Sequence, residues 1–203
     1  DYPWVFQEYI KGKAYCSYSI AQDGKLLAHS VYSSIYCAGQ GATIHFEPFE
    51  SEEILNIVEK IVKELNYTGQ ISFDFIRSDA NNVYYPIECN PRATSGIYLF
   101  SESITEAFRS DYNPSTFIKP NSDKSKMVAF AMLIYALPTL RTLGQGKDFI
   151  KKFYKSKDVV FRLNDMKPFI SQFRGLAYYA DLGKKNNISL MEATTMDIEW
   201  NGK

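Results

Sequence analysis

The sequence predicts an α+β fold in which packed helices cover an antiparallel sheet. Four stretches, at residues 15–21, 25–32, 70–76 and 83–90, alternate apolar and polar side chains, as half-buried strands do. Short polar turns join them in pairs, which favours antiparallel neighbours. Residues 51–66 instead repeat apolar side chains at helical spacing.

The composition indicates an ordinary globular protein and excludes several other classes. The chain has 203 residues, of which 45% are hydrophobic and 23% charged, and its formal net charge is zero. A balanced charge argues against a large nucleic-acid surface, which needs a basic excess. No apolar run reaches the ~18 residues of a membrane span, and no signal peptide is visible. Three cysteines without metal spacing favour the reducing cytoplasm and packing roles for Cys16, Cys37 and Cys89.

The first elements form a meander. Residues 4–10, WVFQEYI, are apolar enough for a strand that ends at Lys11-Gly12-Lys13. Asp23-Gly24 is a strong hairpin signal between the strands at residues 15–21 and 25–32. His29 lies within the second of these strands, where a structural role is expected rather than a catalytic one.

A glycine-containing loop and a helix follow. The loop at residues 38–42 permits close approach of a ligand, although an ordinary loop explains its glycines as well. A short strand is expected at residues 43–46, with His45 at the surface. Ser51 is a good N-cap for a helix over residues 51–66. This helix has one packing stripe, formed by Ile54, Val58, Ile61, Val62 and Leu65.

The helix leads into a hairpin that carries the chemistry-bearing residues. Because side chains two apart on a strand share a face, Glu88 and Asn90 project together. Residues 79–82 supply turn residues, and the turn length places Asp74 opposite Glu88. Two carboxylates and an amide oxygen then converge above the sheet, with the Arg92 guanidinium close behind.

Hard oxygen ligands with open coordination positions suit Mg²⁺ or Mn²⁺, which shares its remaining sites with water and substrate phosphates. An arginine beside them suits a phosphoryl oxygen. The alternative is a hairpin whose acids face solvent. Asp74 lies between two phenylalanines and Glu88 between Ile87 and Cys89, which favours a metal site with Asp74, Glu88 and Asn90 as ligands.

Phe73-Asp74-Phe75, followed by a short loop and IECNPR, resembles the metal-binding end of the ATP-grasp fold. That is the fold of biotin carboxylase, of the large subunit of carbamoyl-phosphate synthetase and of many carboxylate–amine ligases. The resemblance covers roughly residues 4–100 and implies ATP as cofactor, with Mg²⁺ or Mn²⁺ held by Asp74, Glu88 and Asn90. It implies Arg92 as the catalytic arginine at the transferred phosphoryl group. It also places adenine and ribose at a hinge strand, on Gln7, Glu8, Tyr9 and Ile10.

The resemblance divides the chain into two expected parts. Residues 1–110 would form the C-terminal lobe of an ATP-grasp fold, and residues 111–203 a C-terminal extension or small α+β subdomain. After a loop at residues 93–96, whose Thr94 and Ser95 are either substrate donors or plain loop residues, the sequence favours helical structure at 97–108. The extension is expected to contain four features: a linker at 111–126, an apolar strand or helix at 127–137, and helices at 147–154 and 168–182.

The resemblance implies an ATP-dependent ligase that activates a carboxylate as an acyl phosphate for attack by an amine or similar nucleophile. The family's glycine-rich phosphate loop and lysines precede the hinge, and the chain starts at Asp1-Tyr2-Pro3 without them. We therefore expect a partner lobe from the same protein, and no catalysis by this part alone. The alternative is a non-catalytic nucleotide-binding or metal-binding regulatory module. The carboxylate, the amine and the oligomeric state stay open.

Overall fold

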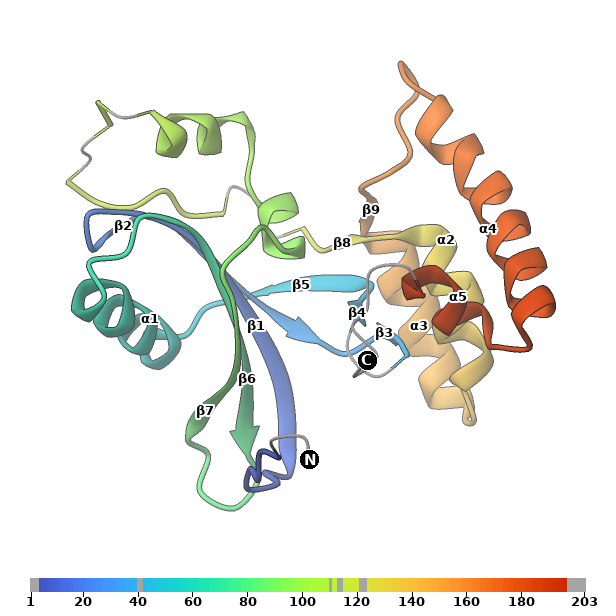
Figure 1. The fold of residues 1–203 in the computed structure, drawn as a ribbon, viewed down its shortest axis with the longest axis horizontal. Coiled ribbons are helices and arrows are strands. Elements are labelled where there is room, and N and C mark those ends of the chain that lie inside the picture. Colours follow the sequence, from blue (N-terminus) through green and yellow to red (C-terminus); the bar gives the residue numbers. More distant parts are fainter. Residues whose placement is uncertain (1–3, 40–41, 110, 113–114, 121–123, 197–203) are drawn as a thin grey trace.

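The computed structural model describes residues 4–39, 42–109, 111–112, 115–120 and 124–196. A seven-stranded sheet forms its centre (Figure 1), in the order β7-β6-β1-β2-β5-β8-β9. All neighbouring pairs are antiparallel except β8 and β9. The strands are β1 (Gly12–Gln22), β2 (Lys25–Ser34), β5 (His45–Phe49), β6 (Gly69–Ser78), β7 (Tyr84–Asn90), β8 (Lys126–Met127) and β9 (Lys157–Asp158). The predicted α+β class is confirmed.

The predicted hairpin turns are present. Asp23 and Gly24 both have positive φ, 48° and 76°, as the tight turn between β1 and β2 requires. Asn82 has a φ of 61° in the turn between β6 and β7. A small second sheet pairs β3 (Cys37–Ala38) with β4 (Ala42–Thr43). The strand predicted over residues 43–46 is therefore split between β4 and β5.

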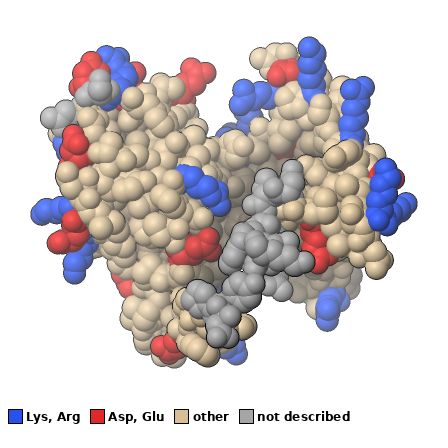
Figure 2. Space-filling view, in the orientation of Figure 1, with Lys and Arg blue, Asp and Glu red and all other residues tan. Residues whose placement is uncertain are grey.

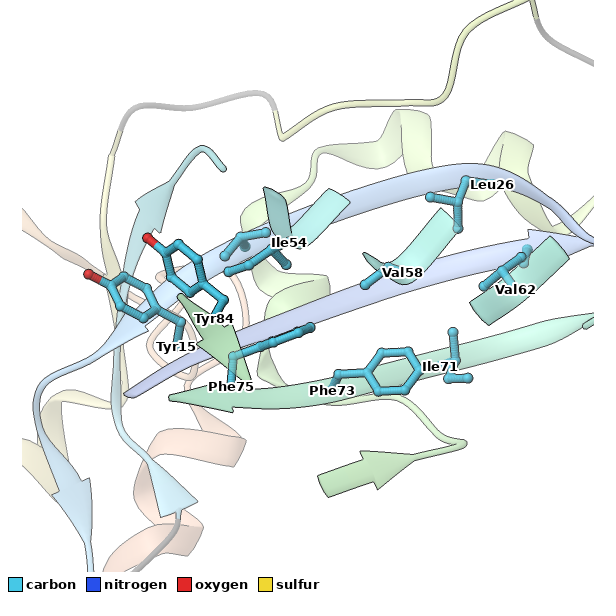
Figure 3. Packing of buried hydrophobic residues seen from close by; sticks show 11 residues of the cluster. Tyr15, Leu26, Ile54, Val58, Val62, Ile71, Phe73, Phe75 and Tyr84 are labelled. Carbon is cyan, nitrogen blue, oxygen red and sulfur yellow. The ribbon is translucent and has the colours of Figure 1, made fainter. Parts of the chain in front are cut away.

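One face of the sheet is covered by helix α1 (Glu52–Glu64), which begins after Ser51 as predicted. The Ser51 hydroxyl accepts a hydrogen bond from the Ile54 N–H at 3.2 Å. Four residues of the predicted stripe pack against aromatic and aliphatic side chains of β1, β2, β6 and β7 (Figure 3): Ile54, Val58, Ile61 and Val62. The predicted packing role of Leu65 is wrong, because this residue caps the end of the helix and is 65% exposed. The members of this core labelled in Figure 3 are Tyr15, Leu26, Ile54, Val58, Val62, Ile71, Phe73, Phe75 and Tyr84.

The opposite face is covered by two 3₁₀ helices, η1 (Ser95–Leu99) and η2 (Glu102–Phe108), where helical structure was predicted. Leu99 packs with Cys16, Tyr32 and Phe46 of the sheet. Ile104 and other residues of η2 pack with Tyr18 and its neighbours. This face also carries Asp74 and Glu88.

A helical body packs around β3, β5 and β8 at one end of the sheet (Figure 1). The segment at residues 129–139 is helical throughout and changes from α-helix to π-helix to 3₁₀ helix. Of the two structures expected for the apolar run at 127–137, strand or helix, the helix is therefore the main one. The helices here are α2 (Ala129–Ala131), η3 (Met132–Ala136), η4 (Leu137–Thr139), α3 (Leu143–Lys155), α4 (Lys167–Asn186) and α5 (Leu190–Thr195). In the described part of the chain no helix is long and apolar enough to cross a membrane.

The prediction of a strand over residues 4–10 is wrong. These residues form no strand, and pairing in β1 begins only at Gly12, opposite Ser78. Trp4, Phe6 and Tyr9 are 84%, 95% and 88% exposed, so their apolar character reflects no burial in this chain. Because residues 4–10 have no neighbouring strand, their backbone groups form no ladder of hydrogen bonds that would stabilise a strand.

Candidate nucleotide and metal site

The hairpin of β6 and β7 brings the predicted metal ligands together. Asp74 pairs with Glu88, and Ser72 pairs with Asn90. Directly opposed residues point to the same side of a sheet, so the two carboxylates and the Asn90 amide lie on one face. The predicted pairing of Asp74 with Glu88 is present, although the register beside the turn differs from it by one residue.

A β-bulge separates this site from the hydrophobic core. Asp74 pairs with Glu88 but Phe75 pairs with Pro86, so Ile87 is an extra residue in β7. The alternation predicted over residues 83–90 would place Tyr84 and Glu88 on the same face, because they are four residues apart. The bulge instead lets Tyr84 pack under helix α1 while Glu88 faces the other side. The predicted orientation of Tyr84 is therefore wrong.

Asp74 is the most perturbed acid of the site. Burial raises the pKa of its carboxyl, and the neighbouring Glu88 carboxylate raises it further. A hydrogen bond with the Cys16 thiol and the charge of Arg92 act in the opposite direction.

Cys16 lies opposite Asp74 in the sheet and is buried there. Burial raises the pKa of its thiol, and the Asp74 carboxyl raises it further, so Cys16 is a neutral neighbour of the site. The sequence indicated a packing residue, and the alternation of residues 15–21 could have placed it on the Asp74 face. Cys89, also predicted to pack, is exposed, because helix α1 does not cover that part of β7.

The loop that carries Arg92 is fastened to the sheet. The Ser72 hydroxyl donates to the Arg92 carbonyl at 3.3 Å and lies 2.9 Å from the Thr94 hydroxyl. Ser30 donates to the Gly96 carbonyl at 3.2 Å. Thr94 is thus engaged with the sheet, which favours the structural reading of the loop hydroxyls. The Arg92 guanidinium itself is exposed and donates to the Ala93 carbonyl at 3.2 Å.

The donor set fits a small hard cation. Two carboxylates and one amide oxygen on one face match the ligands that Mg²⁺ and Mn²⁺ prefer. A cation would also offset the repulsion that raises the pKa of Asp74. Among the described residues no group of three or more His, Cys, Asp and Glu side chains forms a metal cluster. A metal here would therefore need phosphate or water oxygens to complete its coordination.

The predicted adenine segment lies beside the tip of the same hairpin. Glu8, Tyr9 and Ile10 line a pocket of about 410 Å³ together with Ser78, Asp79 and other residues of the β6–β7 turn. The Asp79 N–H donates to the Lys11 carbonyl at 3.0 Å and fixes the segment there. Ser78 lies four residues along β6 from Asp74, about 13 Å on a strand. Gln7 is exposed outside this pocket.

Two other predictions concern histidines and the glycine loop. His45 is fully buried rather than at the surface, with its Nε2 2.9 Å from the Ser156 hydroxyl, because the helical body covers that strand. His29 is buried, and burial lowers its pKa to about 4, in keeping with the structural role expected. Residues 40 and 41 of the glycine loop lie outside the described residues.

A comparison with protein families finds one match, which covers slightly less than half of the chain. Residues 1–96 match the ATP-grasp domain family, so the resemblance drawn from the hairpin is confirmed. A comparison with curated proteins finds no match.

Solved structures of two carboxylases and a synthetase are similar to part of the chain. Biotin carboxylase from Campylobacter jejuni has 15% identity and a TM-score of 0.41, over 54% of this chain and 28% of that one. N5-carboxyaminoimidazole synthetase from Staphylococcus aureus has 12% identity and a TM-score of 0.43, over 64% and 39%. Pyruvate carboxylase from Rhizobium etli has 18% identity and a TM-score of 0.38, over 46% and 9%. The chain spans a minor part of the length of each.

Proposed function

We propose that this chain, whose residues 1–96 match the ATP-grasp domain family, supplies the nucleotide-binding and metal-binding part of an ATP-dependent ligase. The ligase activates a carboxylate as an acyl phosphate, and an amine or similar nucleophile then displaces the phosphate. The observation that carries the proposal is the pairing of Asp74 with Glu88, which sets two carboxylates on the face that also carries Asn90.

Each residue of the site has a stated role in the proposal. Asp74, Glu88 and Asn90 hold Mg²⁺ or Mn²⁺, which shields and orients the phosphates of ATP when it is bound. Arg92 offers a forked donor to the phosphoryl group as it leaves ADP for the substrate carboxylate. Cys16, kept neutral by burial, offers no thiolate that would compete with the two carboxylates for the cation. Most of the catalysis is then positioning and charge stabilisation.

The adenine of ATP lies, in this proposal, in the pocket between residues 8–10 and the β6–β7 turn. The main chain there offers the donor and acceptor that the edge of adenine requires. Phosphates extending along β6 from that pocket would reach Asp74, which shares a face with Ser78. The exposed Trp4, Phe6 and Tyr9 then face the other lobe of the fold, which brings the remaining phosphate ligands.

Calorimetric titration of Mg²⁺ with ADP tests the proposal directly. We expect weak, metal-dependent binding to this chain, and loss of that binding in Glu88→Ala. Glu59→Ala is the matched control, because Glu59 is exposed on helix α1 at the opposite face of the sheet. Equal binding by wild type and Glu88→Ala would refute the assigned metal ligands, and equal loss in Glu59→Ala would make the effect one of overall charge.

A further inference from the structure

A second cavity lies apart from the hairpin, between the 3₁₀ helices and the strands β8 and β9. Its volume is about 1110 Å³. Tyr98, Phe100 and Glu102 lie along one wall, and Lys126, Lys157 and Arg162 along the other. Figure 2 shows a hollow between the part of the molecule formed by the sheet with its covering helices and the helical body, with basic side chains at the edge of the hollow. We call this cavity the interbody cleft.

Two of its cations are directly opposed. Lys126 pairs with Lys157 in the parallel ladder of β8 and β9, so the two side chains leave the same face of neighbouring strands about 4.8 Å apart. Like charges in such positions destabilise a sheet. Burial lowers the pKa of the half-buried Lys126, and the charges of Lys157 and Lys124 lower it further. The ion pairs found among the described residues use other cations: Arg109, Lys152 and Lys185.

The acids of the cleft do not neutralise these lysines. Asp158 accepts hydrogen bonds from the N–H groups of Ala129 at 3.0 Å and Phe161 at 2.9 Å, and so caps the neighbouring turns. Its register opposite Met127 turns it toward the other face of the sheet. Glu102 lies on the opposite wall in η2 and is exposed to water. The repulsion between Lys126 and Lys157 is therefore left for a ligand to relieve.

We propose that the interbody cleft binds a phosphate monoester whose organic part is aromatic. A dianion placed between Lys126 and Lys157 offsets both charges, and the Arg162 guanidinium matches phosphate oxygens with a forked pair of bonds. The rings of Tyr98 and Phe161, 47% and 37% exposed, offer apolar surface to the attached group. Tyr98 is held in place by stacking on Phe46, with ring centroids 6.2 Å apart.

This ligand is distinct from the nucleotide of the proposed function. Strand β8 is four strands away from β6 in the sheet, about 19 Å from Asp74 across the ladder. None of the residues lining the cleft belongs to the hairpin of Asp74 and Glu88. Lys126 and Lys157 nevertheless lie on the same face of the sheet as Asp74. This follows from the strand pairing, which puts Cys16, Tyr32 and Phe46 of the intervening strands on that face as well.

Titration with phenyl phosphate, in the absence of Mg²⁺ and nucleotide, tests the inference. We expect saturable binding at millimolar concentration, tighter than that of inorganic phosphate because of the ring. Benzoate separates phosphate from carboxylate recognition: equal or tighter binding of benzoate would overturn the phosphate assignment. Lys157→Met should weaken phenyl phosphate binding by about tenfold, the effect of losing one charge-assisted hydrogen bond.

The melting temperature provides a second test. We expect Lys157→Met to raise it, whereas a misfolded variant would melt at a lower temperature than wild type. Lys157→Met removes one of two opposed charges, so the unliganded variant should melt at a higher temperature than wild type. Phenyl phosphate should then raise the melting temperature of wild type more than that of the variant. Lys60→Met on helix α1 is the control and should change neither binding nor the ligand's effect. If Lys157→Met binds phenyl phosphate as tightly as wild type, or if wild type does not bind it, the inference is overturned. Neither result depends on whether the β6–β7 hairpin binds Mg²⁺ and ADP.

Discussion

Burial and the adjacent Glu88 carboxylate raise the pKa of Asp74, so the folded chain binds a proton there more tightly than the unfolded chain does. Between the unfolded and folded pKa values of this carboxyl, the native state holds more protons. The contribution of the Asp74 carboxyl to the stability of the fold is therefore greatest at low pH, and it is lost as the pH rises through the pKa that this carboxyl has in the folded chain. A charged Asp74 is a cost of folding that the proposed metal would offset.

Asp74→Asn removes the charge, keeps the shape and replaces the carboxyl with a neutral amide that still forms hydrogen bonds. We expect this variant to melt at a higher temperature than wild type at neutral pH, and the difference to shrink as the pH falls and Asp74 becomes protonated. Thermal melts of both proteins over a pH series measure this. The same variant should lose metal-dependent ADP binding. A variant less stable than wild type at neutral pH would mean that the charged form is net stabilising, through Cys16 and Arg92.

The shared face of Glu88 and Asn90 was predictable from the sequence, because side chains two apart on a strand point to the same side. Their pairing with β6 is not fixed by the turn alone. Beside the turn Arg77 lies opposite Tyr84, a register that would continue to Asp74 opposite Ile87, and the bulge at Ile87 shifts the partner of Asp74 to Glu88. The burial of His45 was not predictable in the same way. It depends on the hydrogen bond to Ser156, which lies 111 positions further along the chain. Contacts over such separations leave no local signal.

At the scale of elements, the segment after β7 is held by close approach to the sheet. A Cβ at Gly96 would lie 2.4 Å from the Tyr18 Cβ and 2.9 Å from the Ser30 hydroxyl. Neither atom is the far end of a flexible side chain, so a larger residue must push η1 and the Arg92 loop away from the sheet. The close approach of Gly96 to the sheet therefore helps to position Arg92, the proposed catalytic arginine, which lies four residues earlier in the same loop.

Gly96→Ala should lower the free energy of unfolding by about 1–3 kcal/mol, the usual cost of overpacking. It should also weaken Mg²⁺-ADP binding, because the displaced loop carries Arg92. Denaturant unfolding and calorimetry measure the two effects. Gly146→Ala is the matched control: no atom lies within 4 Å of its added Cβ, and alanine in helix α3 should be neutral or stabilising by up to about 1 kcal/mol. Wild-type stability in Gly96→Ala would contradict the close approach.

Elements were predictable where periodicity and capping agree, as for helix α1 after Ser51. Helix α3 was predicted to begin four residues too late, because Gly144 and Gly146 weaken its helical pattern. A capping box between Thr142 and Gln145 marks its true start. The bulge at Ile87 was not predictable, since no glycine marks it. It resolves a conflict between two residues, Tyr84 and Glu88, that must face opposite ways.

For the whole molecule, the central sheet continues beyond the matched domain. The two-residue strands β8 and β9 extend it, and residues 118 and 28 form a further bridge between the halves of the chain. Strands of two residues have no periodicity, so the sequence did not predict that residues 111–203, expected to form a C-terminal extension or small α+β subdomain, add strands to the sheet. The division at residues 110 and 111 stays a prediction, with the second half contributing strands to the first.

Extending the chain to include the other lobe of the proposed fold should bury the aromatic segment at residues 4–9. In a Trp200→Phe background, the emission of Trp4 should shift to shorter wavelength in the extended protein, and Mg²⁺-ADP should bind more tightly. This chain alone should show no ATP turnover in a phosphate-release assay with candidate carboxylates and amines. Turnover by residues 1–203 would contradict the need for a second lobe, and an unshifted Trp4 would show that this segment is not the contact.

The irregular β7 also bears on how copies of the protein behave in concentrated solution. β7 is the outermost strand of the sheet and is largely exposed, the position from which sheets aggregate edge to edge. Pro86 has no N–H to offer an incoming strand, and the extra residue at Ile87 breaks the ladder beside it. The bulge that separates Tyr84 from Glu88 therefore also protects the open edge against fibril-like growth, which a regularised β7 would invite.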